Sequence, residues 1–402
     1  MKKKKLLHKN FLTNKYFKKK SKKNSFFKIL SEINNNCDFK KDTYHVLSNK
    51  YDFNFKNSNL KKFKKFKNIA IVGMGGSILG TNAIHDFLRY KIKKEVIFFD
   101  NIDREKINRF KKKNKTKNYL FIIISKSGNT IETISNLIEL NILKYNAKNI
   151  IIISERNKNI LNIISKKYNL PFIEHKEYLG GRYSVLSEVG IVPSYLMGVN
   201  VIKLRSNLKK YLRTPEKLFL KDSCVAISQV LNEKKFKNLI FINYSPKLEK
   251  FLLWCQQLIA ESLGKKGKGL LPVISNAPKD HHSLLQLYLD GPKDKIFYIF
   301  SERESHGKKL KTKKISNKLD HLHNKDIEQV KNAQEKALRK VLVKNKIPFR
   351  EFTINYFDEQ TLGELFSYFI LETSIVGKLS NINPFDQPAV EHVKVHTKQL
   401  LS

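Results

Sequence analysis

Six consecutive residues in the first half of the chain combine three hydroxyls, one amine and a glycine, in the order Ser125-Lys126-Ser127-Gly128-Asn129-Thr130. An apolar run precedes them and an amphipathic stretch follows, which predicts a strand leading into a turn and then a helix. Free N–H groups at a helix start, hydroxyl donors and an ammonium together suit a phosphate monoester. An ordinary helix cap would explain one of the hydroxyls but not all three. The segment lacks the Gly-Lys-Ser/Thr ending of a P-loop, so hydrolysis of a nucleoside triphosphate is not favoured.

A second candidate ligand turn is Gly73-Met74-Gly75-Gly76-Ser77, which follows a short apolar run. Glycines at such a place let the backbone approach a ligand closely. The glycines also resemble the dinucleotide pattern Gly-x-Gly-x-x-Gly loosely, and Asp100 lies near the separation that this pattern expects. The motif is weak by itself, because a tight turn between strand and helix would explain it as well.

Four later segments contain groups that suit proton transfer and charge stabilisation. They are Gly181-Arg182-Tyr183-Ser184, Gln257 with the segment 261–265, His282 to Gln286, and Phe385 to Lys394. A carboxylate can move a proton between carbon atoms, and an arginine can stabilise the oxyanion that develops. For each of these residues a structural role is the alternative. Glu261 could be a surface acid and Arg182 part of a salt bridge, while His282 could cap a helix and Lys394 could be an ordinary lysine. For Lys394 taken alone, the structural alternative is the stronger one.

The elements that must position these residues alternate between apolar runs and amphipathic stretches, which predicts an α/β fold with mainly parallel sheets. In the first half we expect strands at 69–72, 96–99, 119–124 and 149–154, and helices at 78–90 and 131–145. In the second half we expect strands at 239–243, 270–274, 296–300 and 349–354, and helices at 216–232, 246–263, 281–289, 326–344, 359–379 and 390–401. From these elements we expect three parts of the chain: a basic, mostly helical extension (1–64), a first domain (65–213) and a second domain with a C-terminal helix (214–402).

These segments together resemble the phosphoglucose isomerase family. The segment 125–130 after a Gly-Gly-Ser turn is similar to a sugar isomerase (SIS) domain, and the four later segments resemble, in the family's order, its arginine, base, histidine and C-terminal motifs. The resemblance runs from residue 69 to residue 394. It implies two three-layer α/β/α SIS-type domains and reversible isomerisation of glucose-6-phosphate to fructose-6-phosphate, through ring opening and a cis-enediol, in glycolysis and gluconeogenesis.

The resemblance also implies a role for each matching residue. Glu261 would be the base, Arg182 would stabilise the enediolate, and His282 and Lys394 would open the sugar ring. Neighbouring His281 competes for the histidine role, but the spacing to Ser283 and Gln286 favours His282. The phosphate would lie on Ser125, Lys126, Ser127 and Thr130, and the residues that would line the sugar pocket are Gly76, Ser77, Gln257 and Gln387. The family implies no cofactor, no metal and a homodimer in which the histidine is shared across the interface.

One residue departs from the family pattern, because Ala389 stands where the family usually has glycine. A Cβ there would cost about 1 kcal/mol if the backbone needs a positive φ, and we expect it to be tolerated.

Two alternatives stay open: a non-catalytic sensor of sugar phosphates built from SIS domains, and a related isomerase that also accepts mannose-6-phosphate. The sensor would not need the base, arginine, histidine and lysine together.

The charge of the chain is unusual, because 78 Lys and Arg face 36 Asp and Glu among 402 residues and give a net charge of +42. Such a balance can indicate a nucleic-acid or anionic-membrane partner. Lysine, asparagine, isoleucine and phenylalanine are enriched together throughout the chain, which favours a biased composition instead, and we expect neither partner. The three cysteines are far apart, which is typical of a reducing compartment, and we expect a cytoplasmic protein without a membrane span.

Overall fold

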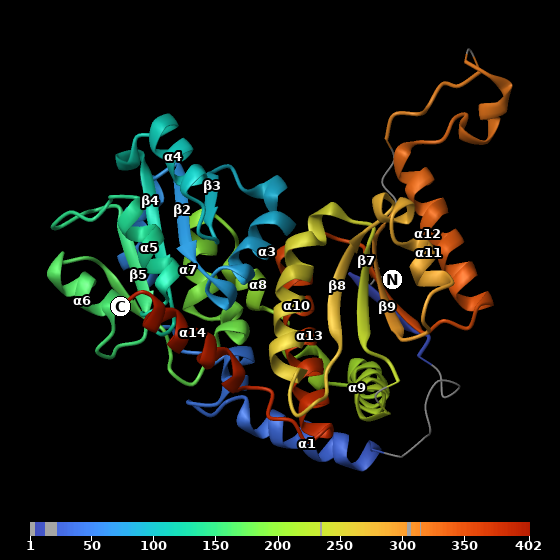
Figure 1. Cartoon of the computed structure of the whole chain (residues 1–402), viewed down its shortest axis with the longest axis horizontal. Coiled ribbons are helices and arrows are strands. Elements are labelled where there is room, and N and C mark those ends of the chain that lie inside the picture. Colours follow the sequence, from blue (N-terminus) through green and yellow to red (C-terminus); the bar gives the residue numbers. More distant parts are fainter. Residues whose placement is uncertain (1–4, 13–21, 234, 304–306, 314) are drawn as a thin grey trace.

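The computed structural model of the chain describes residues 5–12, 22–233, 235–303, 307–313 and 315–402. Two five-stranded sheets lie in the two halves of the molecule, each flanked by helices (Figure 1). The strand order is β3-β2-β4-β5-β6 in the first sheet and β1-β10-β9-β7-β8 in the second. The α/β fold with mainly parallel sheets that the sequence predicts is confirmed.

The first sheet is parallel throughout. Its strands are β2 (Asn68–Gly73), β3 (Glu95–Phe99), β4 (Tyr119–Ile124), β5 (Ile150–Ser154) and β6 (Phe172–Glu174). The helices of this half are α3 (Leu79–Phe87), α4 (Arg104–Lys113), α5 (Ile131–Glu139), α6 (Ile160–Lys167), α7 (Glu188–Met197) and α8 (Val201–Arg205). Because the strands are parallel, the turns that follow β2 and β4 meet at one edge of the sheet.

The second sheet is parallel except for β1, which pairs antiparallel with β10. Its strands are β7 (Asn238–Asn243), β8 (Leu271–Asn276), β9 (Lys295–Glu302), β10 (Phe349–Ile354) and β1 (Leu6–Asn10). The helices of this half are α9 (Glu216–Glu233), α10 (Glu249–Leu263), α11 (Leu285–Leu289), α12 (Ile327–Lys344) and α13 (Glu359–Leu379). The remaining helices are α1 (Lys23–Asn36), α2 (Asn57–Lys61) and α14 (Pro388–Leu400).

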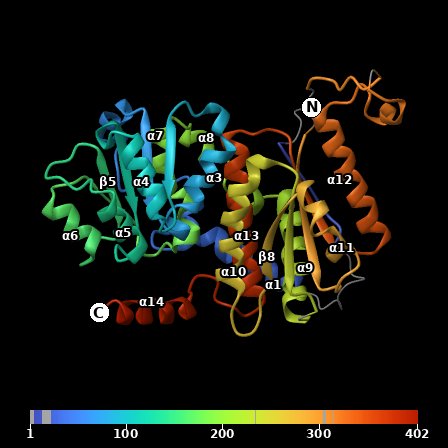
Figure 2. The ribbon, with the colours of Figure 1, turned by 45° about the horizontal axis from the view of Figure 1, so that its top comes forward.

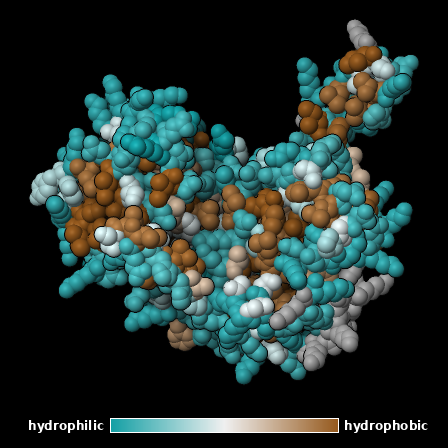
Figure 3. Space-filling view, in the orientation of Figure 1, coloured by the Kyte–Doolittle hydropathy of each residue, from teal (hydrophilic) through white to brown (hydrophobic). Residues whose placement is uncertain are grey.

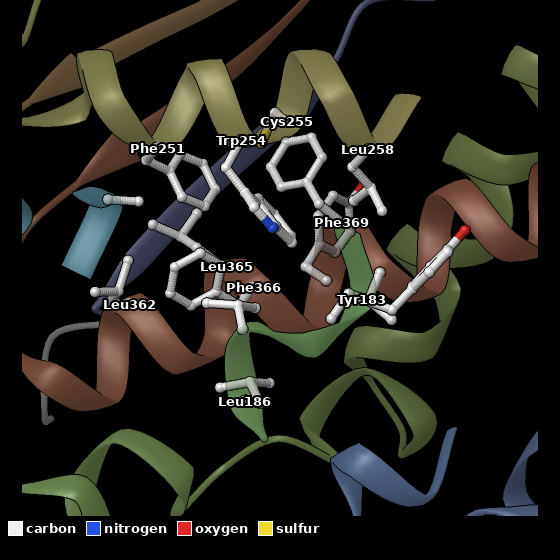
Figure 4. Close-up of a cluster of buried hydrophobic side chains, with 14 of the residues drawn as sticks. Tyr183, Leu186, Phe251, Trp254, Cys255, Leu258, Leu362, Leu365, Phe366 and Phe369 are labelled. Atoms are coloured by element: carbon white, nitrogen blue, oxygen red, sulfur yellow. The ribbon is translucent and has the colours of Figure 1, made fainter. Parts of the chain in front are cut away.

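Successive residues of the central strands are buried on opposite faces, which explains their continuous apolar runs. On β2, Ile69 and Ile71 join a large core that also contains α10 and α13, whereas Ala70 and Val72 face a smaller core with α4 and α5. The large core continues from the first half into the second. Figure 4 shows its centre, where Trp254 of α10 lies against Phe366 of α13 with ring centroids 4.8 Å apart. This shared core fixes α10 relative to the first sheet.

The N-terminal segment differs from the mostly helical extension that the sequence predicts, because its residues Leu6–Asn10 form strand β1. Leu6 is buried and the residues after it alternate in exposure, and β10 would otherwise leave its backbone groups unpaired at the sheet edge. Helix α1 fits the prediction, while residues 1–4 and 13–21 of the predicted extension lie outside the described residues. A second difference is that α5 ends at Glu139 rather than near 145, because Asn141 takes a left-handed φ of 52°.

The predicted boundary between residues 213 and 214 falls just before α9, and it stays a prediction because the large core crosses it. The predicted C-terminal helix forms as α14, which Figure 2 shows set apart from both sheets, and none of its residues is buried. Within the described ranges, no helix combines the length and the apolar character that crossing a membrane requires.

Candidate active site

Arg182 is the centre of the candidate site and is buried, with 1% of its side chain exposed. It lies in the 3₁₀ helix η6 (Gly181–Leu186) of the first half. A guanidinium has five N–H donors, and each finds an acceptor here. Nε donates to Ser262 at 2.8 Å, and Nη2 donates to the carbonyls of Pro384 at 2.7 Å and Asp386 at 2.9 Å. Nη1 donates to the Gln387 amide oxygen and to Glu261 at 3.2 Å.

Glu261 and Gln257 lie one turn apart on α10 and therefore on the same helical face. Nε2 of Gln257 donates to Oε1 of Glu261 at 3.0 Å, while Oε2 accepts from Arg182. Both carboxylate oxygens are thus held, and 29% of the Glu261 side chain remains exposed. The result is an oriented carboxylate that solvent or a ligand can still reach.

The glycine turn after β2 packs directly against these residues. A Cβ on Gly75 would lie 2.8 Å from Nε2 of Gln257, and Gly75 has a φ of +51°. A Cβ on Gly76 would lie 2.2 Å from the carbonyl carbon of Gly181. At Gly76 the clash would be with backbone, so packing requires glycine, whereas at Gly75 the left-handed φ favours glycine. Ser77 ends the turn and is buried.

The segment 125–130 follows β4, and Gly73 at the end of β2 pairs with Ile124, so the two turns are neighbours. The Ser125 and Thr130 hydroxyls lie 2.9 Å apart, and Thr130 is the residue before α5 but its side chain caps no N–H group. Ser127 is exposed. The ammonium of Lys126 donates to the Glu177 carbonyl at 2.8 Å and lies 3.5 Å from Oε1 of Glu155. Hydroxyls and a helix N-terminus thus lie together in the segment 125–130, as an anion site requires, and we call this segment the cradle.

Two of the predicted site residues, His282 and Lys394, lie on other elements than Arg182 and Glu261. His282 is exposed at the end of the 3₁₀ helix η9 (Lys279–His282), after β8. Lys394 lies on α14, with 57% of its side chain exposed, and pairs with Glu391 at 2.6 Å. Neither contributes to the hydrogen bonds of Arg182 and Glu261 described above. His281 differs from its neighbour, because its Nε2 pairs with the Tyr244 hydroxyl at 2.8 Å and burial lowers its pKa.

A family model described as "Phosphoglucose isomerase" matches residues 52–402 of the chain. The chain belongs to the phosphoglucose isomerase family. The resemblance that the motifs predicted is therefore confirmed, and the family match includes the segments that carry Arg182, Glu261 and Gln387.

Curated relatives of the phosphoglucose isomerase family match most of this chain. A glucose-6-phosphate isomerase of Methanocaldococcus jannaschii is 33% identical over 346 residues, which cover 84% of this chain and 85% of the relative. A probable glucose-6-phosphate isomerase of Methanococcus maripaludis is 35% identical and covers 84% of this chain and 81% of its own length. Among solved structures, a glucose-6-phosphate isomerase from Chlamydia trachomatis has a TM-score of 0.72 at 19% identity, covering 86% of this chain and 71% of its own. A hypothetical protein from Thermus thermophilus has a TM-score of 0.81 at 21% identity, covering 95% of both chains.

The departure from the family pattern at Ala389 has a simple structural context. Ala389 lies in the first turn of α14, directly after Pro388, and it is not among the residues with a positive φ. A Cβ is therefore compatible with the backbone at this position, and Gln387 still reaches Arg182.

Sequence reasoning did not assign roles to the residues that hold Arg182 in place. Ser262 accepts from Nε of Arg182 and also pairs with the Tyr183 hydroxyl at 2.8 Å. The indole of Trp254 donates to the Arg182 carbonyl at 3.2 Å. Ser262 and Tyr183 directly follow Glu261 and Arg182 in the sequence, so adjacency to a candidate residue is the signal that would have found them. Trp254 offers no such signal.

Proposed function

We propose that this chain is a glucose-6-phosphate isomerase that interconverts glucose-6-phosphate and fructose-6-phosphate with Glu261 as the base. The observation that carries the proposal is the Glu261 carboxylate held between Nη1 of Arg182 and Nε2 of Gln257. A carboxylate fixed beside a buried cation suits proton abstraction next to a carbonyl, where the product of abstraction is an oxyanion. The names of the curated relatives support the same reaction.

The phosphate of the sugar would lie on the cradle after β4. The Ser125 and Thr130 hydroxyls donate to its oxygens, Ser127 adds a hydroxyl at the exposed side, and Lys126 supplies a positive charge. The N-terminus of α5 adds free N–H groups. The adjoining turn of Gly76 and Ser77 leads from this cradle to Arg182, so a sugar held at its phosphate extends toward the base.

In the isomerisation itself, Glu261 takes the proton from C2 of the open-chain aldose. The electrons of that C–H bond form the C1–C2 double bond of the enediolate, and the C1–O1 double bond becomes a single bond whose negative charge on O1 is stabilised by Arg182. The proton of the O2 hydroxyl then passes to O1, the C2–O2 bond becomes the carbonyl, and Glu261 returns its proton to C1, which gives the ketose. Gln257 and Gln387 hold sugar hydroxyls and orient the two charged side chains. The step needs no oxidant, because the hydrogen stays within the sugar.

Ring opening precedes this step and needs an acid and a base at the ring oxygen and the anomeric hydroxyl. We assign these roles to His282 and Lys394. Because His282 is exposed on the second half of the chain, we propose that it serves the site of a second copy in a homodimer. His281 is unsuited to the role, since Tyr244 already engages its Nε2.

Two parts that stand away from the body support the homodimer. The described part of the segment between β9 and α12, which includes η10 (Asn317–Leu322), extends outward, and Figure 3 shows hydrophobic residues on it. Ile315 of this segment is 72% exposed. Helix α14 exposes Val393 and Leu400 at 68% and 88%. Such side chains are typical of surfaces that a partner covers.

We place the protein in the cytoplasm, in glycolysis and gluconeogenesis. The three cysteines are free and buried, as in proteins of a reducing compartment. The positive charge of the chain would attract a phosphorylated sugar and raise its encounter rate at low salt. We propose no nucleic-acid or membrane partner.

The test is fructose-6-phosphate formation by the purified protein in EDTA, with Glu261→Gln as the variant. Turnover without added metal that falls by orders of magnitude in the variant supports the assignment of the base. Absence of turnover, with sugar phosphate still bound, would favour the sensor instead. Turnover of mannose-6-phosphate in the same assay separates the two isomerase activities.

A further inference from the structure

The loop between α13 and α14 is held by Lys265, which lies outside the proposed catalytic residues. Nζ of Lys265 donates to the carbonyls of Asn383 and Asp386, each at 2.6 Å, and to the Asp386 carboxylate at 2.7 Å. An ammonium has three N–H donors, so all of them are used on this one loop. Only 12% of the Lys265 side chain is exposed, which is unusual in a chain so rich in surface lysine.

Lys265 and Asp386 both border residues of the candidate active site. Lys265 follows the end of α10, four residues beyond Glu261, and Asp386 directly precedes Gln387. The carbonyl of Asp386 also accepts from Nη2 of Arg182 at 2.9 Å. One carbonyl therefore joins the lysine after the base to the buried arginine, and the next residue along the chain contacts that arginine through its side chain.

The rest of the loop is braced by the same few groups. Pro384 O accepts from Arg182 and from the Tyr183 hydroxyl, and Asn383 donates to Oδ2 of Asp386 at 2.9 Å. The ammonium of Lys265 lowers the pKa of Asp386, which keeps the carboxylate ionised. Helix α14 itself has no buried residue, so its placement depends on this loop.

We propose that Lys265 and Asp386 form a positioning clasp that fixes Gln387 and the start of α14 relative to Glu261. The clasp rests on the proposed function, and its residues act through others rather than on the sugar. Displacement of about 1 Å at a catalytic group can cost a factor of about 10² in rate. The expected consequence of opening the clasp is a larger change in kcat than in the KM for the sugar phosphate, because Gln387 supplies only part of the contacts to the sugar and the phosphate cradle lies on the first sheet.

The variants are Lys265→Met, which removes all three hydrogen bonds and keeps most of the stem, and Asp386→Ala, which leaves the two carbonyl acceptors in place. Lys266→Met is the matched control, since Lys266 is exposed and the described structure gives it no hydrogen bond. We expect Lys265→Met to lower kcat per folded molecule by at least tenfold and Asp386→Ala by less. Lys265→Arg, which restores charged donors, should recover part of the loss.

A second readout does not depend on turnover. Hydrogen exchange of peptides spanning residues 383–390 should be faster in Lys265→Met than in Lys266→Met. If the native enzyme does not isomerise the sugar, the proposed function fails while this exchange experiment still tests the clasp. Equal exchange in the two variants, or an unchanged kcat per folded molecule in Lys265→Met with only a lower melting temperature, would overturn the proposal.

Discussion

Nη1 of Arg182 lies 3.2 Å from Oε2 of Glu261, which joins a residue of the first half to a residue of the second half of the chain. Arg182 is nearly inaccessible, whereas part of Glu261 is exposed. Gln257 holds the other carboxylate oxygen. The carboxylate is therefore fixed in orientation from two sides, and substitutions at the pair should separate chemistry from binding.

Glu261→Gln should lower kcat roughly 10³-fold, since a general base contributes about 10²–10⁴ to such a reaction. The amide keeps the size of the side chain and still offers one oxygen to Arg182, so sugar-phosphate binding should persist. Initial rates of fructose-6-phosphate formation give kcat and KM. Glu249→Gln, the same change in the first turn of the same helix, is the control and should stay near native. A fully active Glu261→Gln variant would show that Glu261 is not the base.

Arg182→Lys keeps the positive charge, but an ammonium has three N–H donors whereas the guanidinium donates to five acceptors. We expect kcat to fall about 10²–10³-fold, the usual effect of losing one oxyanion donor, together with a lower melting temperature because buried acceptors lose their partners. Steady-state kinetics and thermal unfolding measure both. Arg213→Lys, at an exposed position, should change neither. If kcat held while only stability fell, Arg182 would be a structural ion-pair residue.

The sequence predicted the strand-to-turn segments well because local rules govern them. β2 and β4 are buried on both faces and read as apolar runs, and the glycines and hydroxyls that follow mark the turns. The contact between Arg182 and Gln387 is different, because it spans 205 residues and depends on how α13 and α14 leave the core. Strand β1 was missed because five residues beside many lysines give little periodicity. If His282 serves the site of a second copy, as we propose, its place relative to Glu261 depends on an assembly that the sequence of one chain does not describe.

Gly128→Ala should raise the KM for the sugar phosphate roughly tenfold, equivalent to about 1.4 kcal/mol of binding. Gly128 has a φ of +66°, and a Cβ there would lie 1.9 Å from Oδ1 of the buried Asn159, so the cradle has to shift. Gly198→Ala is a matched control: its φ is +93°, yet no atom lies within 4 Å of the added Cβ. It should lose stability and keep its KM. Equal KM values for the two variants would mean that the cradle does not bind the phosphate.

Arg350→Met tests a buried ion pair that the reaction does not use. Arg350 donates to both oxygens of Glu372, at 2.6 and 3.2 Å, and the two side chains are 0% and 4% exposed. Removing one partner leaves a buried charge uncompensated, so we expect a loss of about 3–5 kcal/mol in the free energy of unfolding. Denaturant titration measures it. The double variant Arg350→Met, Glu372→Leu should recover much of that loss, and failure to recover would mean that packing, not charge, causes the effect.

A mixture of two inactive variants tests whether His282 serves the site of a second copy. Glu261→Gln and His282→Gln should each be nearly inactive alone. If each site takes its base from one chain and its histidine from the other, a mixed dimer contains one intact site and one doubly altered site. Co-expression at equal amounts should then restore about a quarter of the native activity, since half of the dimers are mixed. Mixing Glu261→Gln with Arg182→Lys, both in one chain's half of the site, restores no intact site and is the control. Activity that stays absent in the first mixture, with mixed dimers demonstrated by mass spectrometry, would place His282 within its own subunit's site.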